Sequence, residues 1–168
     1  SGKVAQLCFN LRWHRLIRKA RKLVRSGLLG RLKAIRSVYT HDRTGENAPD
    51  WHRKLALGGG VGFNEAVHHY DLWCHLTGRK VVETNYLHTP SPVYEDETAV
   101  LSARMDGGIL ASGVFSFLTG PNSELELFGD KGRLLISLYR FDGLQFYSSS
   151  IYPGAIADRL KRGARSLL

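Results

Sequence analysis

Residues 58–72 decide the fold, and they read Gly58-Gly59-Gly60-Val61-Gly62-Phe63-Asn64-Glu65-Ala66-Val67-His68-His69-Tyr70-Asp71-Leu72. The pattern predicts a helix over residues 63–77, because at about 100° per residue its polar side chains fall within an arc of about 60°. These polar residues are Asn64, His68, Asp71 and His75. A neighbouring apolar face consists of Phe63, Ala66, Val67, Tyr70, Trp73 and Cys74. The helix is therefore expected to pack and to carry polar chemistry, behind glycines that let another backbone or a ligand come close.

The rest of the chain predicts one more helix and a series of strands. Apolar residues repeat at helical spacing between Arg12 and Arg25, and Ser26-Gly27 ends the pattern. The repeating residues are Trp13, Leu16, Ile17, Ala20, Leu23 and Val24. Strands are expected at residues 4–10 and 32–41, followed by a long loop at 42–61. Six further strands, rich in β-branched and aromatic residues, are expected at 80–88, 97–105, 109–118, 123–128, 133–139 and 144–148, with a turn at Gly120-Pro121-Asn122 among those that separate them.

This order of elements predicts the fold class α/β (α+β). We expect a two-layer fold with an open, mostly antiparallel β-sheet and the helices packed on one face, as one domain over residues 1–168. With 168 residues, 43% of them apolar, the chain can bury a sizeable core. The chain contains no apolar run of the ~18 residues that a membrane span needs.

The two cysteines and the distribution of charge limit the classes of function that the chain can have. Cys8 and Cys74 show no metal or redox spacing and both lie in apolar runs, so we expect buried free thiols and a cytoplasmic location. The net charge is +9, and 11 of the 24 Lys and Arg precede the first acid, Asp42. A basic face on the helix at 12–25 could attract nucleic acid or an anionic nucleotide. Because no aromatic residue is expected on that basic side, a solvated face is favoured and nucleic acid is the weaker hypothesis.

Several of these segments together resemble the C-terminal domain of the glucose-fructose oxidoreductase, inositol dehydrogenase and MocA family (Gfo/Idh/MocA). The glycine run and helix match the signature GGG-x-x-x-D-x-x-x-H-x-x-D, with His68 at the histidine, Asp71 at the second acid, and Asn64 where most members have aspartate. The resemblance extends in order over about residues 4–147. It includes VAQLCFNLR from Val4, SGLLGRLKAI from Ser26, Trp51-His52-Arg53, Asp96, and FGDKGRL from Phe128.

The resemblance implies an NAD(P)-dependent oxidoreductase that acts on a secondary alcohol of a sugar, a cyclitol or a nucleotide-sugar. Family members carry an N-terminal Rossmann domain that holds NAD or NADP and supplies a catalytic lysine. Neither its fingerprint nor its Glu-Lys-Pro segment occurs here, so we interpret the chain as a fragment that is inactive alone. The family also implies a homo-oligomer through the open sheet face, where Val114, Phe115, Phe117 and Leu118 could serve subunit contacts as well as the core.

The implied site combines two catalytic candidates with several substrate contacts. His68 is the expected general base, and Asn64 is expected to orient it or to bind a hydroxyl. The expected substrate-binding residues are Asp71, His41, Arg43, Arg53 and Asn10. Arg12 and Trp51 are weaker candidates. The residues that hold the cofactor are unknown, since they belong to the other domain.

Two alternatives stay open. The aspartate-to-Asn64 change favours a non-catalytic oligomerisation or ligand-sensing relative. Glu65 with His69, or Asp71 with His75, has the i, i+4 spacing of two metal ligands on one helix, but a third ligand would have to come from a distant histidine. We therefore expect no metal.

Overall fold

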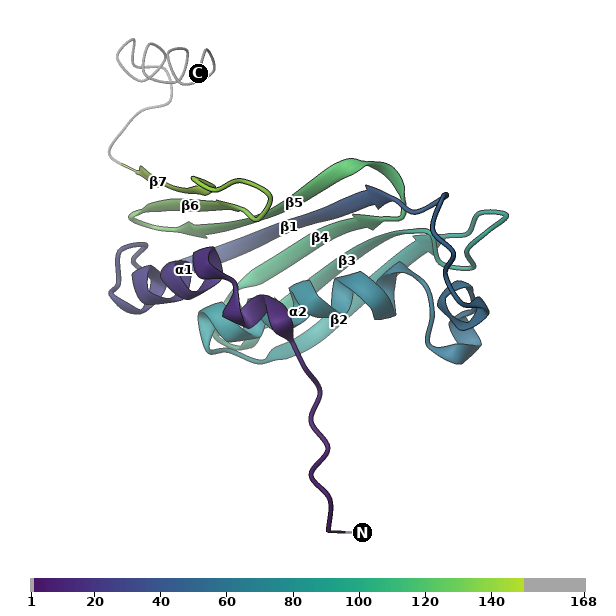
Figure 1. Cartoon of the computed structure of the whole chain (residues 1–168). Coiled ribbons are helices and arrows are strands. Elements are labelled where there is room, and N and C mark those ends of the chain that lie inside the picture. Colours follow the sequence, from purple (N-terminus) through teal and green to yellow (C-terminus); the bar gives the residue numbers. More distant parts are fainter. Residues whose placement is uncertain (1, 150–168) are drawn as a thin grey trace.

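The computed structural model describes residues 2–149, and its centre is a seven-stranded sheet (Figure 1). The strands are β1 (Leu32–Asp42), β2 (Val81–Thr89), β3 (Thr98–Met105), β4 (Leu110–Ser116), β5 (Leu118–Gly129), β6 (Gly132–Ser137) and β7 (Leu144–Ser148). Their order is β2-β3-β4-β1-β5-β6-β7. Only the β1–β4 pair is parallel among the described strands, because β1 is inserted between two antiparallel series.

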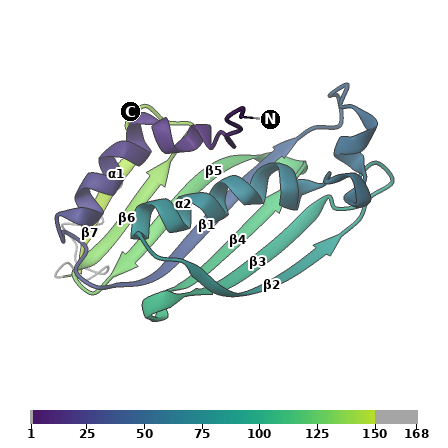
Figure 2. The same ribbon diagram turned by 90° about the horizontal axis from the view of Figure 1, so that it is seen from below.

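The helices lie together on one face of this sheet (Figure 2). They are α1 (Arg15–Arg25) and α2 (Val67–Thr77). The shorter turns are the 3-10 turns η1 (Asn10–Trp13), η2 (Asp50–Arg53), η3 (Leu55–Leu57) and η5 (Asp106–Gly108), the last of which joins β3 to β4, and the π-helical turn η4 (Gly62–Ala66). The predicted two-layer α/β (α+β) class, with an open, mostly antiparallel sheet covered on one face, is confirmed. The described residues contain no helix that is long and apolar enough to cross a membrane.

The core forms between the two helices and the inward face of the central strands. α1 contributes Leu16, Ile17 and Ala20, all nearly inaccessible to solvent. α2 contributes Trp73, whose indole N–H donates a 2.8 Å hydrogen bond to the Ser37 hydroxyl of β1. This bond satisfies two buried polar groups at once, so it fixes how α2 sits over the middle of the sheet.

Five local predictions were wrong. Residues 4–10 form no strand, because this segment is exposed and lies along no edge of the sheet, and Cys8 is exposed with it. Trp13 belongs to η1 and is 75% exposed, since the chain turns at His14 before α1 begins. Phe63 is exposed on the turn that precedes α2. The turn at 120–122 lies inside β5, where the pairing with β1 is shifted by a bulge instead of being interrupted.

The apolar segment at 114–118 divides between the two faces of the sheet. Phe115 and Phe117 are fully buried under the helices, whereas Val114 is 43% exposed on the opposite face. The strand alternation explains this result, since neighbouring side chains point to opposite faces. Phe115 and Phe117 are therefore core residues and offer no surface to another subunit.

The glycine run is a close-packed junction between the loop and β3. A Cβ on Gly59 would meet the backbone of Trp51 and His52, and a Cβ on Gly60 would lie 2.5 Å from Cβ of Asp96. The fully buried carboxylate of Asp96 accepts hydrogen bonds from the Gly62 N–H (3.0 Å) and the Tyr86 hydroxyl (2.7 Å). The space that the glycines leave is thus filled by the protein itself.

His69 lies inside the core although it neighbours the polar stripe. Its ring contacts the rings of Tyr39 (5.6 Å) and Phe115 (5.5 Å), and both of its nitrogens are buried without a hydrogen-bond partner. Burial, assisted by the nearby His68, lowers the pKa of His69 to about 4. The residue is therefore neutral in the folded protein over the physiological range.

We expect Gly60→Ala to destabilise the fold far more than Gly58→Ala. Both glycines have positive φ, +91° and +80°, so each substitution costs about 1 kcal/mol of backbone strain. Only the Gly60 variant also displaces the buried Asp96 carboxylate, whereas no atom lies within 4 Å of a Cβ on Gly58. The added cost is about 2 kcal/mol or more. Urea unfolding measures the stability of both variants. An equal loss of unfolding free energy in the two would contradict the close packing of Gly60 against Asp96.

We expect His69→Phe to make the fold less sensitive to acid. As the pH falls below about 6.5, His69 becomes protonated in the unfolded protein. In the folded protein it stays neutral until the pH approaches about 4. The free energy of unfolding therefore falls by up to ~1.4 kcal/mol per pH unit in this window, about 3 kcal/mol in all. Phe keeps the ring contacts and does not titrate. Unfolding curves at pH 7 and pH 4.5 should show a smaller loss in the variant, and an identical loss in both proteins would refute this role.

Candidate functional site

The polar stripe of the helix at 63–77 starts with two residues that make different contacts. The Asn64 amide donates a 2.8 Å hydrogen bond to the Gly60 carbonyl, four residues earlier. His68, in the first turn of α2, is half-buried and meets the ring of Phe9 edge-on at 5.9 Å. Its Nδ1 is buried without a protein partner. Burial lowers the pKa of His68, and the charge of Asp71 opposes this shift only in part. The imidazole is therefore neutral near pH 7 and can accept a proton.

Asp71 is held by an arginine from the segment before α1. The Arg12 guanidinium donates through Nε to Oδ2 at 2.8 Å and through Nη2 to Oδ1, and the Asp71 side chain is almost fully covered. The hydrogen bond to Asp71 raises the pKa of Arg12. Arg12 also lies over the ring of Phe9, 5.4 Å from its centre. This bidentate pair fixes η1 against α2 and places Phe9 beside His68.

A second group forms where β1 ends. The His41 ring packs against Tyr39 and Phe117 at 5.2 and 5.7 Å, and its Nδ1 is buried without a partner. The Arg43 guanidinium lies 3.6 Å from the Glu65 carboxylate and 4.9 Å from the centre of the Phe117 ring. Burial lowers the pKa of His41, and the positive charge of Arg43 lowers it further.

Glu65 also belongs to this group, although the sequence indicated it only as a candidate metal ligand. It precedes His68 by three residues, so both side chains lie along one side of the helix. Burial raises the pKa of Glu65 to about 7, although the charge of Arg43 opposes the shift. A carboxyl group that titrates near neutral pH is a frequent feature of functional sites. Only its helical spacing from the histidine could have indicated it.

The remaining predicted residues lie around these two groups. Arg53, in η2, accepts the Glu95 N–H through its backbone carbonyl, and its Nε is buried without a partner. Asn10 is exposed in η1, two residues before Arg12. Trp51 is partly exposed and contacts the ring of His52 edge-on at 3.9 Å. The structure thus brings Arg12 to Asp71, and Arg43 to Glu46 at 2.6 Å and to Glu65 at 3.6 Å. Within the described residues, Asn10 and Arg53 form no hydrogen bond or ion pair with the polar stripe.

The described residues contain no group of three or more His, Cys, Asp or Glu side chains arranged to hold a metal ion. In one of the two spaced pairs, His69 packs in the core against Tyr39 and Phe115, and Glu65 lies 3.6 Å from Arg43. Asp71, from the other pair, is held by Arg12. The acid and histidine side chains of this helix therefore serve different contacts.

Comparison with solved structures shows the same fold in oxidoreductases. An oxidoreductase domain protein from Kribbella flavida is 29% identical, with a TM-score of 0.73, over 88% of this chain and 44% of its own. Levoglucosan dehydrogenase in complex with NADH and levoglucosan is 24% identical, with a TM-score of 0.75, over 89% and 44%. The WlbA dehydrogenase from Bordetella pertussis, in complex with NADH and UDP-GlcNAcA, is 21% identical, with a TM-score of 0.72, over 95% and 48%. The chain spans less than half the length of each.

A comparison of the sequence with curated proteins found no match. A comparison with models of protein families found one. The profile of the GFO/IDH/MocA C-terminal domain matches residues 17–135, which contain β1, the glycine run, α2 and the strands through most of β6. This match includes the junction at Asp96 and the helix that carries His68. The chain therefore belongs to the GFO/IDH/MocA family, as its C-terminal domain.

Proposed function

We propose that this chain is the substrate-binding and catalytic domain of an NAD(P)-dependent oxidoreductase that acts on a secondary alcohol of a sugar, a cyclitol or a nucleotide-sugar. The observation that carries the proposal is the state of His68. It occupies the histidine position of the family signature, it projects from a helix fixed to the sheet, and burial keeps it neutral near pH 7. Oxidation of an alcohol requires a base of this kind within hydrogen-bond reach of the hydroxyl.

The proposed division of labour assigns the proton to His68. The alcohol proton passes to the neutral imidazole as the C–H bond breaks, and the positive imidazole that forms lies three residues from the Asp71 carboxylate, which stabilises it. Arg12 is a positioning residue in this scheme, since it holds Asp71. Asn64 contributes by fixing the turn that precedes His68 through its bond to Gly60.

Substrate hydroxyls have candidate partners at unsatisfied polar atoms. Buried polar groups without a partner are few in folded proteins. Three of the proposed site residues carry one each: His68 at Nδ1, His41 at Nδ1 and Arg53 at Nε. Arg43, with Glu65 beside it, and the exposed Asn10 complete the proposed substrate contacts.

The cofactor in this proposal is NAD or NADP, held mainly by an N-terminal Rossmann domain. When bound, this cofactor would supply the acceptor for the hydride that leaves the alcohol carbon as His68 takes the proton. The glycine run offers it no cradle, because the space at Gly59 and Gly60 is filled by Trp51, His52 and Asp96. We therefore propose that residues 1–168 form a single domain that is inactive alone. A cytoplasmic location stays a prediction.

One observation favours the alternative of a non-catalytic relative. The Asn64 amide donates to the Gly60 carbonyl, and a carboxylate at this position could not make that bond. The asparagine therefore suits a structural turn better than a proton relay. His68 remains able to exchange a proton in either case, so its substitution separates the two functions.

We also propose that the chain forms a homo-oligomer through the open face of the sheet. The strand register aligns four apolar residues across this face, from the edge inward Leu87, Val100, Val114 and Val38. Leu87, Val100 and Val114 are 64%, 45% and 43% exposed. Neither α1 nor α2 covers this side of the sheet (Figure 1). A contiguous exposed apolar row is characteristic of a protein interface.

In the full-length enzyme, His68→Ala should lower kcat by about 10²- to 10⁴-fold and change KM much less, because the base acts in the transition state. Steady-state kinetics with NAD or NADP and a panel of polyols and sugars measure this effect. An unchanged kcat leaves only the binding or sensing function.

Asn64→Asp is the matched variant for this experiment. It loses the bond to Gly60 and places a carboxylate one turn from His68, which raises the pKa of the imidazole. The variant should therefore retain catalysis while the pH at which kcat/KM rises moves upward. Loss of activity equal to that of His68→Ala would show that Asn64 itself takes part in the chemistry.

The combined variant Val100→Lys and Val114→Lys should dissociate the oligomer, because two buried ammonium groups at an apolar contact cost several kcal/mol. Light scattering after size-exclusion chromatography gives the mass. Asn47→Lys adds charge in an exposed loop and is the control. If the unmodified chain is already monomeric, or the mass of the double variant is unchanged, the sheet face is not the interface.

A further inference from the structure

A basic groove lies between α1 and α2, beside the Arg12–Asp71 pair. Its volume is about 430 Å³. The residues that line it are Arg12, Trp13, Arg18, Arg21, Lys22, Arg25 and His75. The groove continues the polar stripe of α2, since His75 follows Asp71 by one turn and His68 by two. Its α2 side is therefore about 10 Å along the helix from the proposed base.

The charges of this groove are unbalanced. Four cations of α1 follow one another at i, i+3, i+4 and i+7, from Arg18 to Arg25, and none of the described side chains that line the groove is a carboxylate. Such like-charge neighbours destabilise a helix. Nε of Arg21 is buried without a hydrogen-bond partner. Burial lowers the pKa of His75, and the charges of Arg21, Arg12 and Arg25 lower it further. The arrangement thus has several unused donors and a positive potential.

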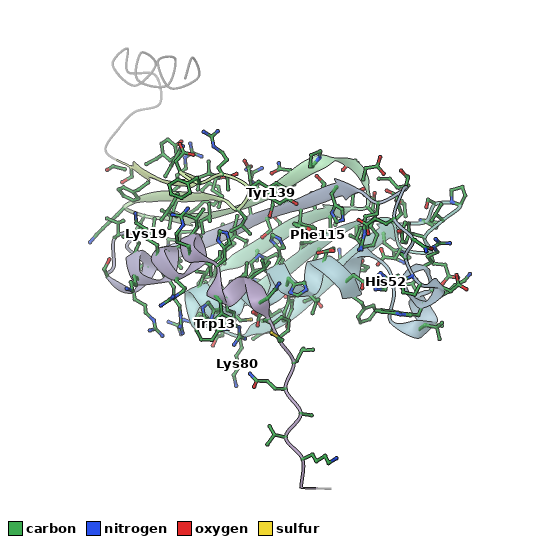
Figure 3. All side chains as sticks on the ribbon, viewed as in Figure 1. Trp13, Lys19, His52, Lys80, Phe115 and Tyr139 are labelled. Carbon is green, nitrogen blue, oxygen red and sulfur yellow. The ribbon has the colours of Figure 1, made fainter. Side chains whose placement is uncertain are left out.

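Trp13 adds a flat apolar surface to this groove. It belongs to η1, it is 75% exposed, and it lies on the helix side of the sheet, away from the strands (Figure 3). An exposed tryptophan beside arginines can stack with a nucleobase, since base–aromatic stacking tolerates every base. The expectation that the basic side of α1 lacks an aromatic residue was therefore wrong, because Trp13 lies outside α1.

We propose that this groove binds the nucleoside diphosphate part of a ligand, with the phosphates on Arg18, Arg21 and Arg25 and the base on Trp13. Guanidinium groups suit phosphate oxygens in both charge and geometry. If the function proposed above holds, the substrate is a nucleotide-sugar whose sugar ring reaches His68 past the Arg12–Asp71 pair. The binding of the nucleotide does not itself require that function.

The shape of the groove favours a small ligand over nucleic acid. The basic side chains line a half-open hollow of about 430 Å³ beside α1, closed on the α2 side by His75, and share a single aromatic platform, Trp13. A polynucleotide site tracks the backbone along an extended basic surface with successive stacking residues. The groove has room for one nucleotide unit, and its affinity should accordingly depend on the diphosphate and the base together.

Isothermal titration of this chain with UDP, pyrophosphate and uridine tests the proposal. UDP should bind with a stoichiometry of one and at least about tenfold more tightly than uridine or pyrophosphate, because charge-assisted hydrogen bonds and stacking add. Arg21→Gln and Arg25→Gln should each weaken UDP and pyrophosphate by about tenfold. Trp13→Ala should weaken UDP and leave pyrophosphate unchanged. Circular dichroism and thermal unfolding confirm that these surface variants fold.

Lys19→Gln is the matched control, since it removes one positive charge from the same helix outside the groove. It should leave UDP binding unchanged. Equal weakening by Lys19→Gln and Arg21→Gln would overturn the site and leave only general attraction to a positive helix. Binding of a single-stranded oligonucleotide more tightly than UDP would overturn it in favour of nucleic acid. If UDP binds no better than uridine, the proposed nucleotide site in the groove is wrong. The proposed oxidoreductase function would stand in that case, since a neutral sugar could still react at His68.

Discussion

The helix that carries the candidate chemistry depends on one buried carboxylate. Asp96 accepts the Gly62 N–H and the Tyr86 hydroxyl, while its backbone carbonyl accepts the Val61 N–H. Both donors to the side chain bond Oδ2, which lowers the cost of burying this carboxylate, so the turn before α2 is held between β2 and β3. Gly60 is needed because a Cβ there would meet Asp96, and Gly59 because a Cβ there would meet the backbone of Trp51 and His52. The position of His68 over the sheet follows from this junction, because α2 continues directly from it.

Most strands and both long helices of this fold could be predicted from the sequence, including the edge strands β2 and β7, whereas the pairing of segments across the sheet could not. The helix at 63–77 and the strand at 32–41 both form where the spacing predicts them. Of the apolar face expected for the helix, however, only Ala66 and Trp73 are buried, while Leu72 and Leu76 also enter the core. Residues 4–10 have a strand-like local composition, but they pair with no strand. The two edges of the sheet are formed by β2 and β7 instead, and local composition does not indicate this. Pro121 indicated a turn, yet the bulge between β1 and β5 accommodates it within the strand. Local propensity was overruled there by pairing across the sheet.

The candidate site shows the same limit at the level of side chains. Helical spacing alone places Asn64, His68 and Asp71 along one stripe. It cannot reveal that Arg12, 59 residues earlier, holds Asp71, or that Arg43 reaches Glu65. The pKa shifts have the same origin, since burial dominates those of His68 and Glu65. Burial is a property of the assembled layers, whereas spacing is a property of one helix.

Buried polar atoms that lack a hydrogen-bond partner indicate where a ligand could bind. Asn64 and Asp71, which flank His68 on the stripe, are both hydrogen-bonded within the chain, Asn64 to Gly60 and Asp71 to Arg12. His68 and Arg21 each retain a buried nitrogen without a partner. Both lie between α2 and the segment that contains η1 and α1, one in each helix. Because folded proteins rarely leave such groups unpaired without reason, this side of the helical layer is a place where a ligand would complete the structure, as is the region of Arg53, whose Nε is also buried without a partner.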